Sequence, residues 1–176
     1  MKKLTLALTL LSGICFGFDQ VEVENILEDA NAKAGVYAYL TAPSNTTCAA
    51  TGSWYQVQGV FSNSVIDGFT VSTSNIVCQC LYTNWFEVDW HCSVQGDSAS
   101  VTPHVTIKVN DTVYEAQMMG TLCKTAGEAY AMSGTVVLPL TSNDTVQLVC
   151  SSDGSGDVLT FNHFVTSICK FFITRD

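Results

Sequence analysis

Basic residues and long apolar runs are both scarce in this sequence. Its 176 residues include only 7 Lys and Arg against 16 Asp and Glu, which gives a formal net charge of −9. Binding to a phosphate backbone needs clustered Lys and Arg, so this composition argues against a nucleic-acid partner. Charged residues make up 13% of the chain and hydrophobic residues 47%. That balance excludes a disordered chain and favours one globular domain with a sizeable core.

The longest apolar run lies at the N-terminus, from Leu4 to Phe18. Its 15 residues fall short of the ~20 that a helix needs to cross a bilayer. The run follows two lysines and ends among small residues, which is the layout of a secretory signal peptide. We therefore expect residues 1–17 to be cleaved and the mature protein to be secreted, with no membrane span. Without this segment, 5 basic residues face 16 acidic ones, a net charge of −11 (5 − 16).

Cysteine is plentiful, with 8 in the chain, of which Cys15 lies in the expected signal peptide. The other seven are disulfide candidates in an oxidising compartment. Their pairing stays open. An odd number leaves one thiol over, either buried or bridging two chains. The candidates are Cys48, Cys78, Cys80, Cys92, Cys123, Cys150 and Cys169.

No cluster of these residues predicts a metal site. Only one residue separates Cys78 from Cys80, whereas zinc knuckles have two or more. On a strand these two side chains point to the same face, so each is expected to need a cross-strand partner. The loop 153–157 carries two carboxylates, but it matches no complete calcium signature and favours a solvated turn. We expect neither a metal nor another cofactor.

Three Asn-x-Thr tripeptides begin at Asn45, Asn110 and Asn143. Each lies beside turn-forming residues, where a glycan would be tolerated. They are glycosylation candidates if the host is eukaryotic.

Helical spacing is confined to residues 18–34, where Val23, Ile26, Leu27 and Ala30 recur among acidic residues. This segment predicts a short acidic helical lead-in. From residue 35 to 176 the period is two, which predicts strands over residues 36–40, 54–61, 85–94 and 158–173. In the clearest of them, residues 86, 88, 90, 92 and 94 share one apolar face, opposite the polar residues 87, 89, 91 and 93. Short strands separated by turns, such as Asn110-Asp111 and residues 142–144, predict an all-β sandwich or barrel.

The order of these segments carries a resemblance to a known family. The strand 36–40, the hairpin within 76–94 and the strand–turn–strand at 105–114 occur in the family's order. The block 133–148, S-G-T-V-V-L-P-L-T-S-N-D-T-V-Q-L, is the strongest mark. From about residue 36 to 173 the chain resembles the tumour necrosis factor and complement globular-head superfamily. It differs in having Asn143 where a turn glycine is commoner, in its many cysteines and in lacking a collagen-like stalk.

The resemblance implies a jelly-roll β-sandwich that acts as a binding module for a protein or glycan, often as a homotrimer. The closing strand adds a physical expectation, because a strand with apolar residues on both faces cannot bury both of them inside one two-layer sandwich. One aromatic face would then remain exposed as an interface. The interface candidates are Phe161, Phe164, Phe171 and Phe172.

Other folds and roles stay open at this point. Gly52-Ser53-Trp54 resembles the opening mark of lipocalins, which are small-molecule carriers, although it lies more than thirty residues into the mature chain. The segment 144–150, D-T-V-Q-L-V-C, resembles an immunoglobulin strand, but only 26 residues follow it. Jelly rolls also build shells, so a structural surface protein is a third possibility.

An enzymatic role is not expected. Gly96-Asp97-Ser98 resembles the nucleophile segment of serine hydrolases, but no Gly-x-Ser-x-Gly elbow is present. The candidate bases are His91, on a polar strand face, His104, at a strand start, and His163, expected to be packed among aromatic residues. Spacing alone shows no triad among these residues.

Overall fold

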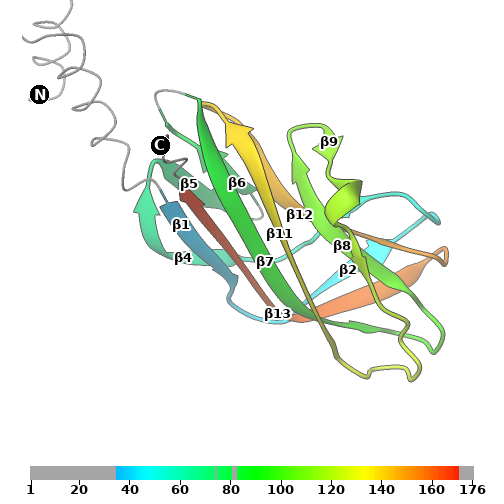
Figure 1. Ribbon diagram of the computed structural model, residues 1–176. Coiled ribbons are helices and arrows are strands. Elements are labelled where there is room, and N and C mark those ends of the chain that lie inside the picture. The colour runs from blue at the N-terminus through cyan, green and yellow to red at the C-terminus, as the bar shows by residue number, and fades with distance from the viewer. Residues whose placement is uncertain (1–34, 74, 81–82, 171–176) are drawn as a thin grey trace, which may run out of the picture. The chain divides into compact units, whose positions relative to one another are not determined.

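The computed structural model describes residues 35–73, 75–80 and 83–170, all of which belong to the unit Lys33–Asp176. This part of the chain is a sandwich of two antiparallel sheets (Figure 1). The arrangement confirms the predicted jelly-roll fold. The predicted signal peptide and helical lead-in lie outside the described residues.

Sheet A has the strand order β11–β7–β13–β1–β4, and β2 also pairs with β13. Most neighbours in this sheet are far apart in sequence, as the two-layer Greek-key connectivity of a jelly roll requires. Its strands are β1 (Gly35–Leu40), β2 (Ser44–Cys48), β4 (Phe61–Asp67), β7 (Asn84–Gly96), β11 (Tyr130–Leu140) and β13 (Asp157–Lys170).

Sheet B has the order β10–β8–β12–β6–β5, with β3 on β12 and β9 on β8. A short 3-10 helix, η1 (Glu115–Gln117), lies between β9 and β10 in the chain. The strands are β3 (Tyr55–Gln56), β5 (Phe69–Ser72), β6 (Asn75–Cys78), β8 (Pro103–Val109), β9 (Thr112–Val113), β10 (Met119–Gly120) and β12 (Thr145–Ser152).

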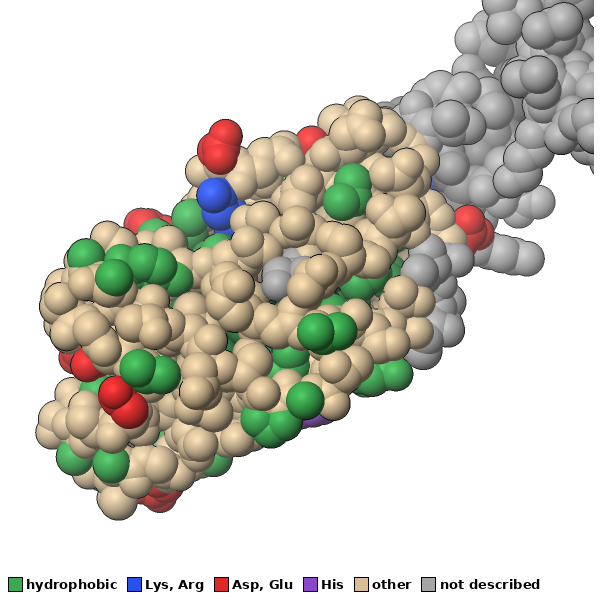
Figure 2. Space-filling view, turned by 180° about the vertical axis from the view of Figure 1, so that it is seen from behind, with side chains coloured by type: hydrophobic (Ala, Val, Ile, Leu, Met, Phe, Trp, Pro, Cys, Tyr) green, Lys and Arg blue, Asp and Glu red, His purple; other side chains and the backbone are tan. Residues whose placement is uncertain are grey.

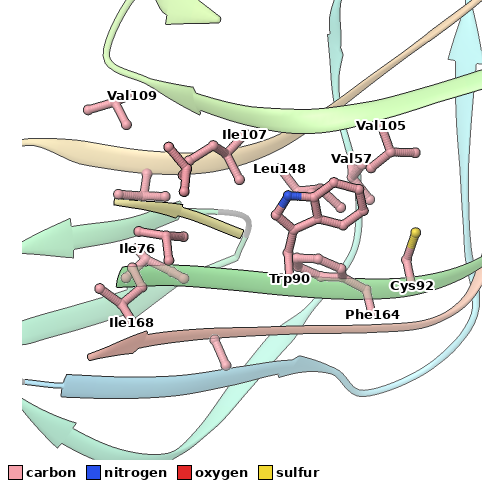
Figure 3. Packing of buried hydrophobic residues seen from close by; sticks show 14 of the residues in the cluster. Val57, Ile76, Trp90, Cys92, Val105, Ile107, Val109, Leu148, Phe164 and Ile168 are labelled. Atoms are coloured by element: carbon pink, nitrogen blue, oxygen red, sulfur yellow. The ribbon is translucent and has the colours of Figure 1, made fainter. Parts of the chain in front are cut away.

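Strict alternation along the long strands builds the core between the sheets. Phe86, Val88 and Trp90 of β7 are at most 1% exposed, and the alternate residues of this strand are less buried. The Trp90 ring projects between the layers toward Val57 and Leu148 (Figure 3). The predicted inward faces at residues 86–94, 105–109, 136–140 and 146–150 are confirmed.

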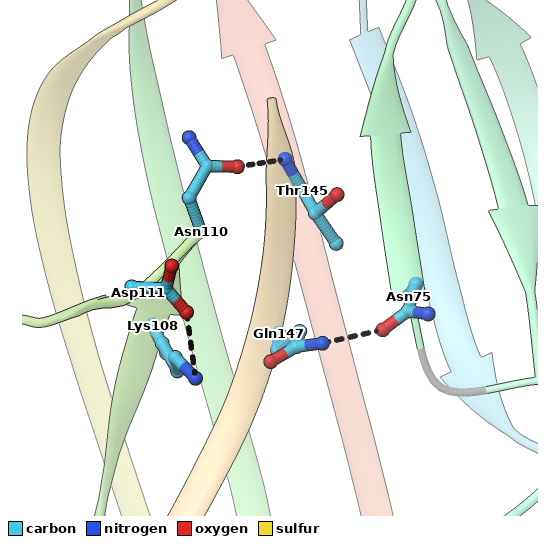
Figure 4. Close-up of polar contacts among 6 residues, drawn as sticks. All are labelled: Asn75, Lys108, Asn110, Asp111, Thr145 and Gln147. Atoms are coloured by element: carbon cyan, nitrogen blue, oxygen red, sulfur yellow. Dashed lines mark hydrogen bonds and ion pairs between the residues drawn. The ribbon is translucent and has the colours of Figure 1, made fainter. Parts of the chain in front are cut away.

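The tight turns are fixed by side chains as well as by the backbone. Asn110 (φ 52°) and Asn143 (φ 72°) adopt the left-handed conformation that asparagine tolerates. The Asn110 Oδ1 accepts a hydrogen bond from the Thr145 backbone N–H at 3.0 Å, which ties the β8–β9 turn to β12 (Figure 4). Both predicted turns are therefore confirmed, and the asparagine at 143 replaces the commoner glycine without a change of backbone conformation.

The continuous strand predicted over 54–61 is wrong. The chain leaves sheet B after β3 and enters sheet A at Phe61, the first residue of β4. Gly59 lies in this crossing with φ 144°, and a Cβ there would lie 2.3 Å from Leu40 Cδ1. The close approach and the positive φ both require glycine, and they interrupt the extended pattern. A search of the described residues finds no helix that is long and apolar enough to cross a membrane.

Candidate self-association surface

The strands of sheet A turn one face toward the core and the other away from sheet B. We call this second side the open face. Its residues lie in rows across the strands, because opposite partners in a sheet share a side. One row runs from Ser133 through His91 and Val165 to Tyr39, and the next from Thr135 through Asp89 and Ser167 to Tyr37.

Exposed apolar side chains lie on the open face in the rows that cross β7 at residues 85–89. Tyr37 is 40% exposed, Val137 is 39% exposed and Trp85 is 48% exposed. The Tyr37 and Tyr39 rings lie 6.2 Å apart, centre to centre, along β1. Aromatic side chains that are held by neighbours yet remain accessible are typical of protein interfaces.

The middle of the open face holds a shallow hollow of about 380 Å³ over β7, β11 and β13. His91 and His163 line it with ring centres 6.0 Å apart, and the small side chains of Ser93, Ala131 and Ser133 form much of its floor. His91 lies on the polar strand face, as predicted. The prediction that His163 is packed among aromatic residues is wrong, because a register shift between Phe161 and His163 turns this histidine outward.

The charged residues of β7 near the hollow are acidic. Asp89 accepts a hydrogen bond from the Thr135 hydroxyl at 2.5 Å across the β7–β11 pair. Glu87 is half-buried in the next row, opposite Val137 and Cys169. The open face therefore combines exposed apolar side chains, two imidazoles and two carboxylates, of which Asp89 is held by a hydrogen bond. On the side seen in Figure 2, opposite to Figure 1, hydrophobic side chains occur only in separate small groups.

The aromatic interface predicted from the closing strand is wrong where it can be checked. Phe161 is 0% exposed and Phe164 2% exposed, because both point into the core from β13. Phe164 meets Phe61 edge-to-face at 5.3 Å between ring centres. Phe171 and Phe172 lie outside the described residues. The outward positions of β13 between Phe161 and the end of the strand are taken by His163, Val165, Ser167 and Cys169.

The seven cysteines expected in the mature chain are all thiols in this structure. Six are buried, and Cys169 alone among the described cysteines is exposed, on the open face. Burial raises the pKa of Cys92 to about 12, and burial together with Cys78 raises that of Cys80 to about 12. Cys78 is the last residue of β6 and Cys80 follows it in the chain, and the nearby Cys78 contributes to the raised pKa of Cys80. The two are therefore neighbours, which the same-face argument for a regular strand did not predict.

The three sequons occupy different settings. Asn45 lies within β2 rather than at a turn, and its Oδ1 accepts a hydrogen bond from the Thr160 hydroxyl at 2.8 Å. The Asn110 Nδ2 donates to Asp144 Oδ1 at 2.8 Å, so a glycan on this nitrogen would disturb the turn. Asn143 is exposed, and its side-chain amide has no hydrogen-bond partner among the described residues, while its backbone N–H donates to the Cys78 carbonyl at 2.8 Å.

The two carboxylates of the loop 153–157 have structural partners. The Thr102 backbone N–H donates to Asp153 Oδ1 at 2.8 Å and lowers the pKa of that carboxyl. Asp157 accepts a hydrogen bond from the Ser152 hydroxyl at the other end of the same loop. Both carboxylates therefore hold the β12–β13 turn. His104 lies in sheet B, on β8, away from the pair on the open face.

A gap between the sheets tests the carrier alternative. It is lined by Phe61, Ile107, Leu148 and Phe164, and its volume is about 10 Å³. That space fits a single water at most, whereas small-molecule sites usually occupy 300 Å³ or more. The core at this point is filled, and the two-sheet topology differs from the closed barrel of a lipocalin.

Comparison with solved structures identifies this topology. The Eiger TNF of S. frugiperda matches with a TM-score of 0.55 at 9% sequence identity, over 82% of this chain and 96% of that chain. The globular domain of zebrafish complement 1qA matches with a TM-score of 0.51 at 15% identity, over 82% of this chain and 100% of that one. The fold is the TNF-like jelly roll. The predicted resemblance is thus confirmed at the level of the fold.

The same architecture extends beyond those two proteins. The PRD1 vertex protein P5 matches with a TM-score of 0.50 at 11% identity, over 78% of this chain and 97% of that chain. No family model matches the sequence, and the search of curated proteins returned no match either. The fold therefore rests on structural similarity, and function has to be argued from the surface.

Proposed function

We propose that this protein is a secreted, disulfide-stabilised binding module that assembles as a homotrimer through the open face of sheet A and recognises a protein or glycan. The observation that carries the proposal is the group of accessible apolar side chains, Tyr37, Trp85 and Val137, beside a hollow on one sheet face. The similarity of fold to the two globular domains above supports it.

A second copy of the chain is the occupant that the open face suits best. Its centre has small side chains and little net charge, so an identical surface can approach it closely. Its exposed side chains offer aromatic area of the kind that carries most of the energy of interfaces. A strongly charged partner is less suitable, because the carboxylates of Asp89 and Glu87 are already fixed or half-buried.

A pair of matched variants tests this proposal. Val137→Glu places a carboxylate opposite Glu87 on the open face, whereas Val60→Glu introduces the same group at a 62% exposed position between β3 and β4. We expect the first to lower the molar mass in light scattering from trimer to monomer, and the second to leave it unchanged. Equal behaviour of the two variants, with both folded, would contradict assembly through this face.

Secretion and glycosylation belong to the same proposal. The predicted signal would deliver the chain to an oxidising compartment, where the sequons and the cysteines both become relevant. Asn143 is the best placed acceptor, because its side-chain amide is exposed and unbonded among the described residues. In a eukaryotic host, Asn143→Gln should remove one glycan mass, while Asn110→Gln should have no effect on the glycan content.

A structural role in a shell is the second candidate. It is favoured by one observation, the similarity of fold to the PRD1 vertex protein P5. A shell protein would form assemblies larger than a trimer, or trimers that associate further at raised concentration. The light-scattering experiment on the unmodified chain separates these outcomes.

A further inference from the structure

Two buried cysteines lie against each other where the two sheets meet. Cys48 is the last residue of β2, opposite Asp157 of β13 in sheet A. Cys150 lies in β12 of sheet B, opposite Val105 of β8 and Tyr55 of β3. Both side chains are 0% exposed, and β2 contacts β12 across the sandwich. The two side chains are close enough for each to be the main cause of the other's pKa shift.

Hydrogen bonds of the surrounding chain hold the end of β2, which carries Cys48, next to the end of β12. The Gly156 N–H donates to the Cys48 carbonyl at 2.7 Å, and the Ser155 hydroxyl donates to the Ala49 carbonyl at 2.9 Å. The Gly52 N–H donates to the Ser152 carbonyl at 3.1 Å, which attaches the loop after β2 to the end of β12. The thiols therefore meet because the surrounding chain is fixed.

The electrostatics of the pair suit thiol–disulfide chemistry. The hydrogen bond from Cys150 lowers the pKa of the Cys48 thiol, and the same contact, with burial, raises the pKa of Cys150. Cys48 is thus the thiol of the pair that loses its proton more readily, as in dithiols that oxidise by attack of one sulfur.

We propose that Cys48 and Cys150 form a disulfide that links sheet A to sheet B. With oxidised glutathione as the oxidant, the Cys48 thiolate attacks one of its sulfurs and releases one glutathione thiolate. Cys150 then loses its proton and attacks the Cys48 sulfur of the mixed disulfide, which releases the second glutathione. Two protein thiols lose two hydrogens, and one small disulfide is reduced to two thiols. The pairing does not depend on the proposed binding function.

Cys92 is the rival partner and the natural control. Its sulfur points into the same part of the interior as Val105 (Figure 3), and Val105 is the cross-strand partner of Cys150. Its charge would also raise the pKa of Cys150. However, no hydrogen bond joins Cys92 to either cysteine of the pair among the described residues.

Peptide mapping of the unmodified chain tests the pairing. The reduced protein is reoxidised in glutathione buffer and blocked with N-ethylmaleimide in denaturant. It is then digested with trypsin and a second protease that cuts between Cys48 and Cys78 and between Cys150 and Cys169, and analysed by mass spectrometry. We expect a peptide containing Cys48 linked to one containing Cys150. A Cys48–Cys92 or Cys92–Cys150 link, or alkylation of both Cys48 and Cys150 after oxidation, would overturn the proposal.

Variants give a second readout. A bond that closes a loop of roughly 100 residues should raise the melting temperature by roughly 10 °C in the oxidised protein. We expect Cys48→Ala and Cys150→Ala to abolish the difference between oxidised and reduced protein, and Cys92→Ala to retain it. Retention of the difference in Cys150→Ala would overturn the pairing. The map of the unmodified chain decides the question if a variant fails to fold.

Discussion

The inner face and the open face of sheet A alternate along the same strands, yet they carry different chemistry. Inward positions hold large apolar side chains such as Phe86, Trp90 and Phe164, each at most 2% exposed. Outward positions hold Ser133, His91 and other small or polar groups, with exposed aromatic side chains among them. Filling the sandwich determines the first set. The second set is not needed to close the core, so it is free to serve recognition.

The two faces should differ most in the reactivity of their cysteines. Burial raises the pKa of inward-facing Cys92 to about 12, whereas Cys169 is exposed on the open face. At pH 8 only about one Cys92 in 10⁴ would be thiolate. In the reduced protein, diluted until it is monomeric, iodoacetamide should modify Cys169 at least ~10³-fold faster. Peptide masses measured over time check this, and equal rates would contradict the burial of Cys92.

Association should also protect Cys169 from modification. If copies associate through the open face, its modification should slow as the protein concentration rises, while Cys92 stays unreactive throughout. A rate for Cys169 that is independent of concentration would place the contact elsewhere.

Removing the largest inner side chain should break the sandwich. Trp90→Ala leaves a cavity between the sheets and should cost about 3–5 kcal/mol of unfolding free energy. Urea unfolding followed by circular dichroism measures the loss. Because marginal domains are stable by only 5–15 kcal/mol, this variant could retain little folded protein. A loss below about 1 kcal/mol would show that the indole is not packed as described.

A smaller effect is expected at the glycine that supports this indole. Gly134 of β11 lies opposite Trp90, and a Cβ there would lie 2.7 Å from the ring. Gly134→Ala should therefore destabilise the protein by about 1–3 kcal/mol through overpacking. Ser133→Ala, one residue earlier and on the open face, is the matched control and should change stability by less than about 0.5 kcal/mol. Similar losses of unfolding free energy for Gly134→Ala and Ser133→Ala would mean that the two residues do not lie on different faces of the sheet.

The smallest stability effect is expected on the open face itself. Val137→Ser removes apolar area that is already 39% exposed, so the unfolding free energy of the monomer should change by less than about 0.5 kcal/mol. Association should weaken nonetheless, because the same area becomes buried between copies. Sedimentation equilibrium and urea unfolding of the same sample separate the two effects. A large loss of monomer stability would show that Val137 belongs to the core.

Alternation was enough to predict much of the fold. The inward residues of β7, β8, β11 and β12 recur with a period of two, and the asparagine turns at 110 and 143 have a local physical cause. The segment 54–61 could not be predicted, because the pattern continues through Gly59 while the chain changes sheets. Nothing local indicates that Gly59 must approach Leu40 so closely.

The candidate site was harder to predict for a similar reason. The irregularity between Phe161 and His163 reverses the sides of the residues that follow, so Phe164 points inward and His163 outward. A single strand pattern cannot reveal a bulge that is set by the partner strand. The pairing of His91 with His163, and that of Cys48 with Cys150, depends on contacts between distant segments. The types of residue were recognisable in the sequence, but their neighbours were not.

The molar mass of the purified mature protein tests the central claim most directly. Light scattering coupled to gel filtration at micromolar concentration should give three times the mass of one chain, and Val137→Glu should give one. A monomeric mass for the unmodified protein under these conditions would contradict assembly through the open face of sheet A.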